Sequence, residues 1–443
     1  MKHTGYPNSR TFWIDLHGCA KNQVDAEEIS ARLETAGWTA RETPEGASVV
    51  IINSCGFIES AKKESLDAVL AVRAQYPQTR ILLAGCLAQR YPEALASDLP
   101  EIDGVFGNGD LSRIQEVAEA ALAGERPVLV PPPAPFGLVS RPRLYSYPRS
   151  AYLKISEGCS NHCSFCAIPL IRGEARSRSA QDIVREARDL ISRGIFEIDL
   201  IGQDLGSYGR DTEGRQALPE LLEELCRLSG DFRIRMLYLH PDHFPEGVLD
   251  VCADDGRILP YFDIPFQHAS EPLLKAMNRT GNSETYLALI DSIRTRLPDA
   301  VLRSTFLVGF PGETEEDFEA LREFQDRARV DWLGAFEYSK EEGTPAAARK
   351  GKVPKRIAAD RRRRVEEAQR LITGNGLRRF LGKTLEVLVE EPVKGEELSL
   401  GRSYAQAPDV DGLVVLNGHF EPGSVVKGRI VAVNGVDLEA VVE

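Results

Sequence analysis

Three of the eight cysteines in this 443-residue chain, Cys159, Cys163 and Cys166, share one short segment. Their CxxxCxxC spacing follows an apolar run at 151–155 and places three thiols on one loop. A structural zinc site is closed by four ligands, but thiolates also select iron–sulfur clusters. Three thiolates on a four-iron cluster leave one iron open to another molecule. The segment therefore predicts an open cluster, with a zinc site or unreactive thiols as the alternatives.

Three further cysteines, Cys19, Cys55 and Cys86, each follow an apolar run that predicts a β-strand. Their intervals of 36 and 31 residues each match one strand–helix–strand unit. The carboxyl ends of parallel strands meet at one edge of the sheet, where ligands bind, so we expect the three thiols to converge. Each cysteine also has a glycine beside it, which lets the backbone approach a bulky group closely. The alternative is three buried structural thiols, since free cysteine is commonly buried.

The elements around the second group of cysteines predict a parallel α/β domain over residues 10–126. Apolar strand runs alternate there with helical patterns at 24–37 and 59–76, as expected of a parallel sheet. Residues 127–148 are proline-rich and predict a linker, or a chain lying over a surface.

Residues 149–378 show six strand–helix units, whereas a full TIM barrel has eight. Cys226 and Cys252 lie on helical patterns there and are expected in the core. Residues 379–443 are glycine-punctuated and rich in short strands, which is typical of a small β-barrel. The predicted fold class is α/β, with an N-terminal parallel α/β domain, a central partial (β/α)6 TIM-like barrel and a C-terminal small antiparallel β-barrel.

The composition excludes several classes of protein. A net charge of −13 and a pI of about 5.3 argue against a general nucleic-acid binder and suit a basic partner. No run approaches the roughly 18 apolar residues that span a membrane, and the N-terminus lacks the apolar run of a signal peptide. We therefore expect a cytoplasmic monomer without a membrane partner.

The segment "CSNHCSFC", with its aromatic Phe165, closely resembles the radical S-adenosylmethionine (SAM) superfamily. The resemblance implies that the open iron of a 4Fe-4S cluster chelates SAM, and that an electron from a donor such as flavodoxin or ferredoxin cleaves it. The radical released from SAM then abstracts hydrogen from a carbon atom. Residues predicted to contact SAM are Phe165 and, at two strand ends, Gly202, Gln203, Asp204, Gly309 and Gly312. Ordinary turn chemistry is the alternative for the strand-end residues.

The whole pattern resembles the radical SAM methylthiotransferases over nearly the entire chain. The resemblance implies that Cys19, Cys55 and Cys86 hold a second 4Fe-4S cluster, which takes part in supplying sulfur. It also implies that SAM serves both as radical source and as methyl donor, and that the C-terminal module is a substrate-recognising TRAM domain. No catalytic residue is assigned beyond the cluster ligands.

The charge of the C-terminal module bears on the substrate. Residues 381–443 hold five Lys/Arg and eleven Asp/Glu, a net charge of −6, whereas a module that grips tRNA should be basic. The segments "HGCAKNQVDAE", "DIPFQHAS" and "GRSYAQAPDVDG" resemble the sequences of certain family members. Those members methylthiolate the β-carbon of an aspartate in the small-subunit ribosomal protein S-twelve. The alternatives are a methylthiotransferase of tRNA (N6-isopentenyl- or threonylcarbamoyl-adenosine) and a non-catalytic metal or iron–sulfur binding protein.

A basic stretch at 349–379, with twelve Lys/Arg against three Asp/Glu, opposes the acidic trend. A solvated helix face is favoured there over a contact with ribosomal RNA.

Overall fold

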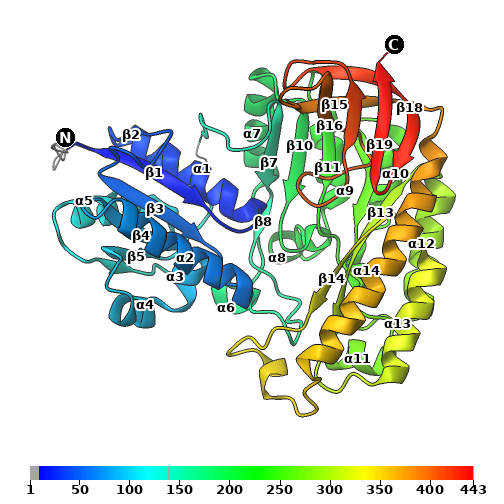
Figure 1. The fold of residues 1–443 in the computed structure, drawn as a ribbon, viewed down its shortest axis with the longest axis horizontal. Coiled ribbons are helices and arrows are strands. Elements are labelled where there is room, and N and C mark those ends of the chain that lie inside the picture. The colour runs from blue at the N-terminus through cyan, green and yellow to red at the C-terminus, as the bar shows by residue number, and fades with distance from the viewer. Residues whose placement is uncertain (1–8, 138–139, 443) are drawn as a thin grey trace.

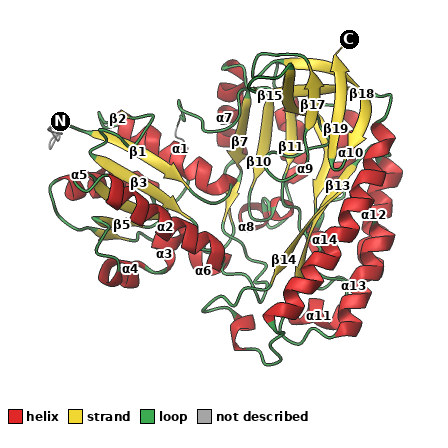
Figure 2. Cartoon of the chain, in the orientation of Figure 1, coloured by secondary structure: helices red, strands yellow, loops and turns green. Residues whose placement is uncertain are grey.

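The structure is a computed structural model that describes residues 9–137 and 140–442. Residues 138 and 139 of the predicted linker, and Glu443 of the last predicted domain, lie outside the described residues. The chain forms two open parallel sheets with helices against them and one closed β-barrel (Figures 1 and 2). None of the helices in the described part is both long and apolar enough to cross a membrane.

The first sheet has six parallel strands in the order β2-β1-β3-β4-β5-β6. Its strands are β1 (Thr11–Leu16), β2 (Thr39–Ala40), β3 (Val49–Ser54), β4 (Arg80–Gly85), β5 (Gly104–Phe106) and β6 (Val128–Leu129). Its helices are α1 (Ala20–Thr35), α2 (Glu59–Gln75), α3 (Cys86–Arg90), α4 (Pro92–Asp98) and α5 (Ile114–Leu122). All of β3 is buried, as expected of a strand covered on both faces. The proline-rich segment contributes β6 as an edge strand.

The second sheet also has six parallel strands, in the order β14-β13-β12-β11-β10-β7, and it does not close. Its strands are β7 (Ser150–Lys154), β10 (Glu197–Ile201), β11 (Arg233–Met236), β12 (Ile258–Asp263), β13 (Val301–Val308) and β14 (Trp332–Glu337). The longer helices after these strands are α7 (Ala180–Ser192), α9 (Leu218–Cys226), α10 (Gly247–Asp254), α12 (Ser283–Arg296), α13 (Glu315–Ala328) and α14 (Lys355–Leu377). The prediction of a partial, six-unit barrel is confirmed.

Short helices, strands and 3₁₀ turns lie between the longer elements of the chain. They are β8 (Ser156–Glu157), α6 (Ile168–Arg172), β9 (Arg176–Ser177), α8 (Arg210–Glu213) and α11 (Glu271–Ala276). Single 3₁₀ turns occur at η1 (Leu111–Arg113), η2 (Leu205–Ser207), η3 (Pro241–His243), η4 (Pro345–Ala348) and η5 (Arg378–Phe380). β8 and β9 form a separate antiparallel pair on either side of the CxxxCxxC segment.

The C-terminal barrel is closed in the order β15-β16-β17-β19-β18. Its strands are β15 (Thr384–Pro392), β16 (Leu398–Arg402), β17 (Val414–Asn417), β18 (Val425–Asn434) and β19 (Asp437–Val442). The small barrel is confirmed, but its expected antiparallel pattern has one exception, because β17 and β19 pair in parallel. These two strands are not joined by a hairpin, since β18 lies between them in the sequence.

The loop between β16 and β17 fastens this barrel to the second sheet. Arg235 of β11 donates to the Tyr404 carbonyl oxygen at 2.8 Å, and Trp332 of β14 donates to that of Ala405 at 2.7 Å. At the start of β10, the buried Glu197 accepts from Arg402 of β16. Removing one partner of this buried ion pair would cost about 3–5 kcal/mol, because the other charge would stay buried and unpaired.

Most of the basic stretch becomes helix α14. Arg361 and Arg364 pair with Glu315 of α13 at 3.0 and 3.1 Å, and Arg363 pairs within its own helix with Asp360 and Glu367. The arginines therefore pair largely with carboxylates of this chain, which agrees with a solvated, ion-paired helix face.

Candidate iron–sulfur sites

The structure brings Cys19, Cys55 and Cys86 together at the carboxyl edge of the first sheet. Cys19 caps α1, Cys55 follows β3, and Cys86 is the first residue of α3. A Cβ built on Gly18 would lie 3.1 Å from the Cβ of Cys55, and one on Gly56 would lie 2.6 Å from the Cys86 carbonyl oxygen. The glycines beside the cysteines thus let three loops pack against one another.

Asn22 on the first turn of α1 holds these loops in place, a role that the sequence analysis missed. Its Nδ2 donates to the carbonyl oxygens of His17 at 3.0 Å and Ser54 at 2.9 Å, one from each of two cysteine loops. Its Oδ1 lies 3.5 Å from Sγ of Cys86 and 3.9 Å from Sγ of Cys19. Asn22 is only 1% exposed. A polar residue on the buried face of a helix, three positions after a cysteine, was the available signal.

Burial raises the pKa of the Cys86 thiol to about 12, although the nearby Arg172 opposes this shift. Burial also raises the pKa of Cys55. The thiolate is the form that binds metal, so thiols of this kind ionise when a cation takes up their charge. Two donors already point at Cys86 Sγ, Arg172 Nη2 at 3.3 Å and Asn108 Nδ2 at 3.4 Å. This environment suits a metal ligand.

The second group, Cys159, Cys163 and Cys166, lies on the loop between β8 and α6. Burial raises the pKa of Cys159 to about 11 and that of Cys166 to about 12, and the neighbouring thiols add to both shifts. Two neighbouring thiols whose pKa is raised in this way need a cation to take up their charge before both can ionise. The donor set fits an iron–sulfur cluster.

The end of α11 and the segment after it brace this loop. Asn278 Nδ2 donates to the carbonyl oxygens of Asn161 and His162, each at 3.1 Å. Ser164 Oγ donates to the Ala276 carbonyl oxygen at 2.8 Å. The first of these braces is exposed, unlike Asn22 at the other site.

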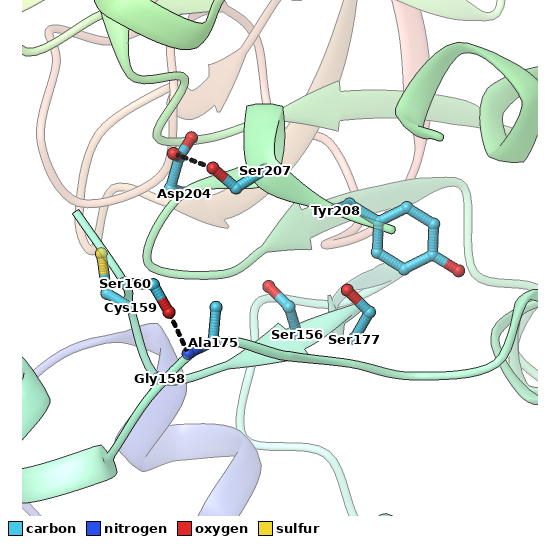
Figure 3. Close-up of a pocket in the computed structure, with 9 residues that line it drawn as sticks. All are labelled: Ser156, Gly158, Cys159, Ser160, Ala175, Ser177, Asp204, Ser207 and Tyr208. Carbon is cyan, nitrogen blue, oxygen red and sulfur yellow. Dashed lines mark hydrogen bonds between the residues drawn. The ribbon is translucent and has the colours of Figure 1, made fainter. Parts of the chain in front are cut away.

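A pocket opens beside Cys159 and spans about 250 Å³, counting the open solvent at its mouth. Figure 3 shows the Cys159 sulfur at one side and the Asp204 carboxylate across from it. The carboxylate accepts from Ser207 Oγ at 2.6 Å and from Asn161 Nδ2 at 2.9 Å, so it also ties the cysteine loop to β10. The pocket is lined by Ser156, Gly158, Cys159, Ser160, Ala175, Ser177, Asp204, Ser207 and Tyr208.

The other residues predicted to contact SAM lie around this pocket or away from it. Gly202 is next to the pocket, since a Cβ there would lie 2.5 Å from Ser156 Oγ. Gln203 turns to Glu157, to which its Nε2 donates at 3.0 Å. Phe165 packs with an apolar group that contains Leu273, Met277, Leu307, Phe310 and Ala346.

Gly309 and Gly312 both have positive φ, of 77° and 95°, and form the turn after β13. A Cβ on Gly309 would lie 2.6 Å from Cβ of Ala358 on α14, and the Gly312 amide donates to the Gly351 carbonyl oxygen at 2.8 Å. Their observed neighbours are thus parts of the chain, which agrees with turn chemistry. Their contact with SAM stays a prediction.

Neither group of thiols is arranged for a single ion. Within residues 9–137 and 140–442, no three His, Cys, Asp or Glu side chains are grouped so that they could hold one metal ion. An iron–sulfur cluster is larger and takes its thiolates on different irons, so its ligands stand further apart. Each group offers three thiolates, a donor set that iron–sulfur clusters take.

Family models match three parts of the chain. Residues 11–107 match the uncharacterized protein family UPF0004, residues 153–324 match the radical SAM superfamily, and residues 381–442 match the TRAM domain. The three matches fall on the first sheet, the second sheet and the closed barrel.

Curated relatives match over nearly the full length. The ribosomal protein uS12 methylthiotransferase RimO of Treponema denticola is 47% identical over 97% of this chain and 100% of that one. The protein of the same name from Desulforudis audaxviator is 44% identical over 98% of this chain and 96% of that one.

Solved structures share the fold at low identity. The radical SAM methyltransferase TsrM from Kitasatospora setae, with cobalamin and a 4Fe-4S cluster bound, aligns with a TM-score of 0.58 at 17% identity. The alignment covers 76% of this chain and 77% of TsrM. Together with the near-full-length relatives, the matched domains settle the assignment: the chain belongs to the RimO family and is a radical SAM methylthiotransferase.

Proposed function

We propose that this enzyme methylthiolates the β-carbon of an aspartate in ribosomal protein uS12. The observation that carries the proposal is the match, over nearly the whole chain, to proteins named ribosomal protein uS12 methylthiotransferase RimO. The C-terminal barrel supports it. Its β15–β16 turn exposes Glu396 and Glu397, with Glu391 also exposed at the end of β15. Exposed carboxylates attract a basic ribosomal protein and repel a phosphate backbone.

The two groups of thiols divide the work in this proposal. Cys159, Cys163 and Cys166 hold the 4Fe-4S cluster that binds SAM, and Cys19, Cys55 and Cys86 hold a second one that handles sulfur. When bound, the first cluster would supply the electron that cleaves SAM, and the second would take part in supplying the sulfur. SAM would also be the methyl donor. The chain itself positions the reacting groups and keeps them from water.

The structure supports this division through its short connection between the two groups. Helix α6 begins two residues after Cys166 and ends at Arg172, which donates to Cys86 Sγ at 3.3 Å. A five-residue helix spans about 7.5 Å at 1.5 Å per residue. Asp204 and a small pocket lie on the side of Cys159, next to the loop that carries this group of thiols.

Methylthiolation of tRNA is the second candidate. Just before α14 and in its first turn the chain exposes Lys350, Lys352, Lys355 and Arg356, for which the described residues offer no carboxylate partner within 4 Å. Free cations of this kind suit a phosphate backbone.

Mass spectrometry of ribosomal proteins and tRNA from a strain without the gene separates the two candidates. We expect the methylthio group to disappear from uS12 and to remain on tRNA. Loss from tRNA alone would reverse the choice. Anaerobic reconstitution should also yield about eight irons per chain and SAM cleavage that depends on a reductant.

A further inference from the structure

A buried group of four charges joins the two cluster-bearing parts of the chain. Asp25 comes from α1, whereas Lys154, Glu157 and Arg172 come from the second sheet and its loops. Lys154 Nζ lies 2.6 Å from Asp25 and 2.8 Å from Glu157, and Arg172 lies 2.9 and 2.8 Å from the same two carboxylates. All four side chains are at most 9% exposed. Two cations and two anions thus balance one another in the interior.

Arg172 differs from Lys154 because it reaches the cysteine site as well. Its Nη2 donates to Cys86 Sγ at 3.3 Å and to Asn22 Oδ1 at 2.9 Å. Cys86 also packs against Ala167 and Ile171, which lie on the segment that leads from Cys166 to Arg172. Figure 1 shows α6 beside α3, the helix that Cys86 begins. Arg172 therefore follows the CxxxCxxC segment in the sequence, but its side chain contacts the site at Cys86.

We propose that Arg172 is a positioning residue for the second cluster: it donates to the ligand sulfur of Cys86 and raises the reduction potential of the cluster bound there. This inference rests on the proposed function, which makes Cys86 a ligand. A guanidinium is planar, keeps its charge, and can donate to several acceptors at once. Hydrogen bonds and positive charge at a ligating sulfur favour the reduced, more negative cluster, and so raise its potential.

Lys154 provides a matched control for this proposal. It sits in the same charge group, but among the described residues its hydrogen bonds are to Asp25 and Glu157 and none is to a cysteine. Arg172→Gln and Lys154→Gln each remove one positive charge from the group. Only the first also removes the donor to Cys86.

The test uses the full-length chain with Cys159, Cys163 and Cys166 all changed to alanine, so that a single cluster is left. After anaerobic reconstitution, its midpoint potential is measured by a redox titration followed by electron paramagnetic resonance. We expect Arg172→Gln to lower the reduced-to-oxidised ratio at a fixed potential about tenfold, which is about 59 mV for one electron. Lys154→Gln should lower this ratio less. The ratio for Arg172→Lys should lie between those of the parent chain, which carries only the three cysteine changes, and Arg172→Gln.

Each outcome decides the proposal. Equal shifts in Arg172→Gln and Lys154→Gln would show that charge alone matters and would overturn the role of Arg172, as would an unchanged potential in Arg172→Gln. If Arg172→Gln loses its iron while Lys154→Gln keeps about four irons, the positioning role of Arg172 is supported. The effect on the midpoint potential is then measured on Arg172→Lys. A parent chain that binds no cluster would overturn the assignment of Cys86 itself, and this inference with it.

Discussion

The two groups of thiols have the same donor set but are built in different ways. Cys159, Cys163 and Cys166 lie within eight residues on one loop, whereas Cys19 and Cys86 are 67 residues apart and meet only because a sheet brings their loops together. The first group is held by an exposed brace at Asn278. The second depends on the buried Asn22 and on glycines packed against a neighbouring backbone.

This difference has a physical consequence. A contiguous motif keeps its thiols near one another even in a loosened fold, so its metal site tolerates local damage. An assembled site pays the full ordering entropy of three loops, and small changes in packing separate its ligands. We therefore expect the site at Cys19, Cys55 and Cys86 to be the more sensitive to substitutions that spare the cysteines.

The largest effect should come from the cysteines themselves. We expect Cys163→Ala to abolish SAM cleavage, and Cys55→Ala to spare cleavage while it stops sulfur insertion, because the two groups have separate roles. Chromatography of 5′-deoxyadenosine measures SAM cleavage, and mass spectrometry of uS12 measures sulfur insertion, with Cys226→Ala as the control. Equal loss of SAM cleavage in Cys163→Ala and Cys55→Ala would contradict the separation.

The next effect should come from the glycine packing. A Cβ at Gly56 would lie 2.6 Å from the Cys86 carbonyl oxygen, and backbone atoms cannot move aside cheaply. Gly56→Ala should cost about 3 kcal/mol of stability by overpacking and should halve the iron content. Gly256 is exposed with nothing within 4 Å of a built Cβ, so Gly256→Ala is the control. Full iron in Gly56→Ala would show that the loops have more freedom than the structure shows.

The two asparagine braces offer a direct comparison of the sites. Asn22→Ala leaves the carbonyl oxygens of His17 and Ser54 without their buried donor, which should cost about 2 kcal/mol. Asn278→Ala removes exposed hydrogen bonds and should cost about 0.5 kcal/mol. Thermal unfolding and iron occupancy of the two variants test this order. A larger loss in Asn278→Ala would mean that the contiguous loop is the more fragile site.

A further effect, smaller than that expected for Asn22→Ala, concerns pH. Burial alone would raise the pKa of Glu157, but Arg172 and Lys154 outweigh it and hold that pKa below its usual value. A carboxyl with a lowered folded pKa stabilises the fold above its unfolded value of about 4.3, and this contribution is lost as the pH falls further. We expect apo-protein stability to fall by about 1 kcal/mol on this account below about pH 5.

Lys154→Gln checks the pH effect, because it weakens the ion pair that lowers the pKa of Glu157. Its melting temperature, measured from pH 7 to pH 4, should depend less on pH than that of the unchanged chain. Identical slopes for the two proteins would place the acid sensitivity elsewhere.

The amino-acid sequence by itself determined the six cysteines as two candidate sites, the two parallel sheets and the small barrel. Strand–helix alternation and thiol spacing are local patterns, and parallel strands carry their loop ends to one edge by geometry alone. It did not reveal the parallel pairing of β17 with β19, since strand patterns give no pairing order.

Only the tertiary structure decided which polar residues serve the sites. Arg172 meets Cys86 across 86 residues, and Asn22 meets Ser54 across 32. Likewise, Arg235 meets Tyr404 across 169 residues, which joins the closed barrel to the second sheet. Contacts of this kind leave no periodic signal in the sequence, because the partner of each polar group depends on which residue lies opposite it in the folded chain. Burial makes such partners obligatory, and burial is a property of the whole fold.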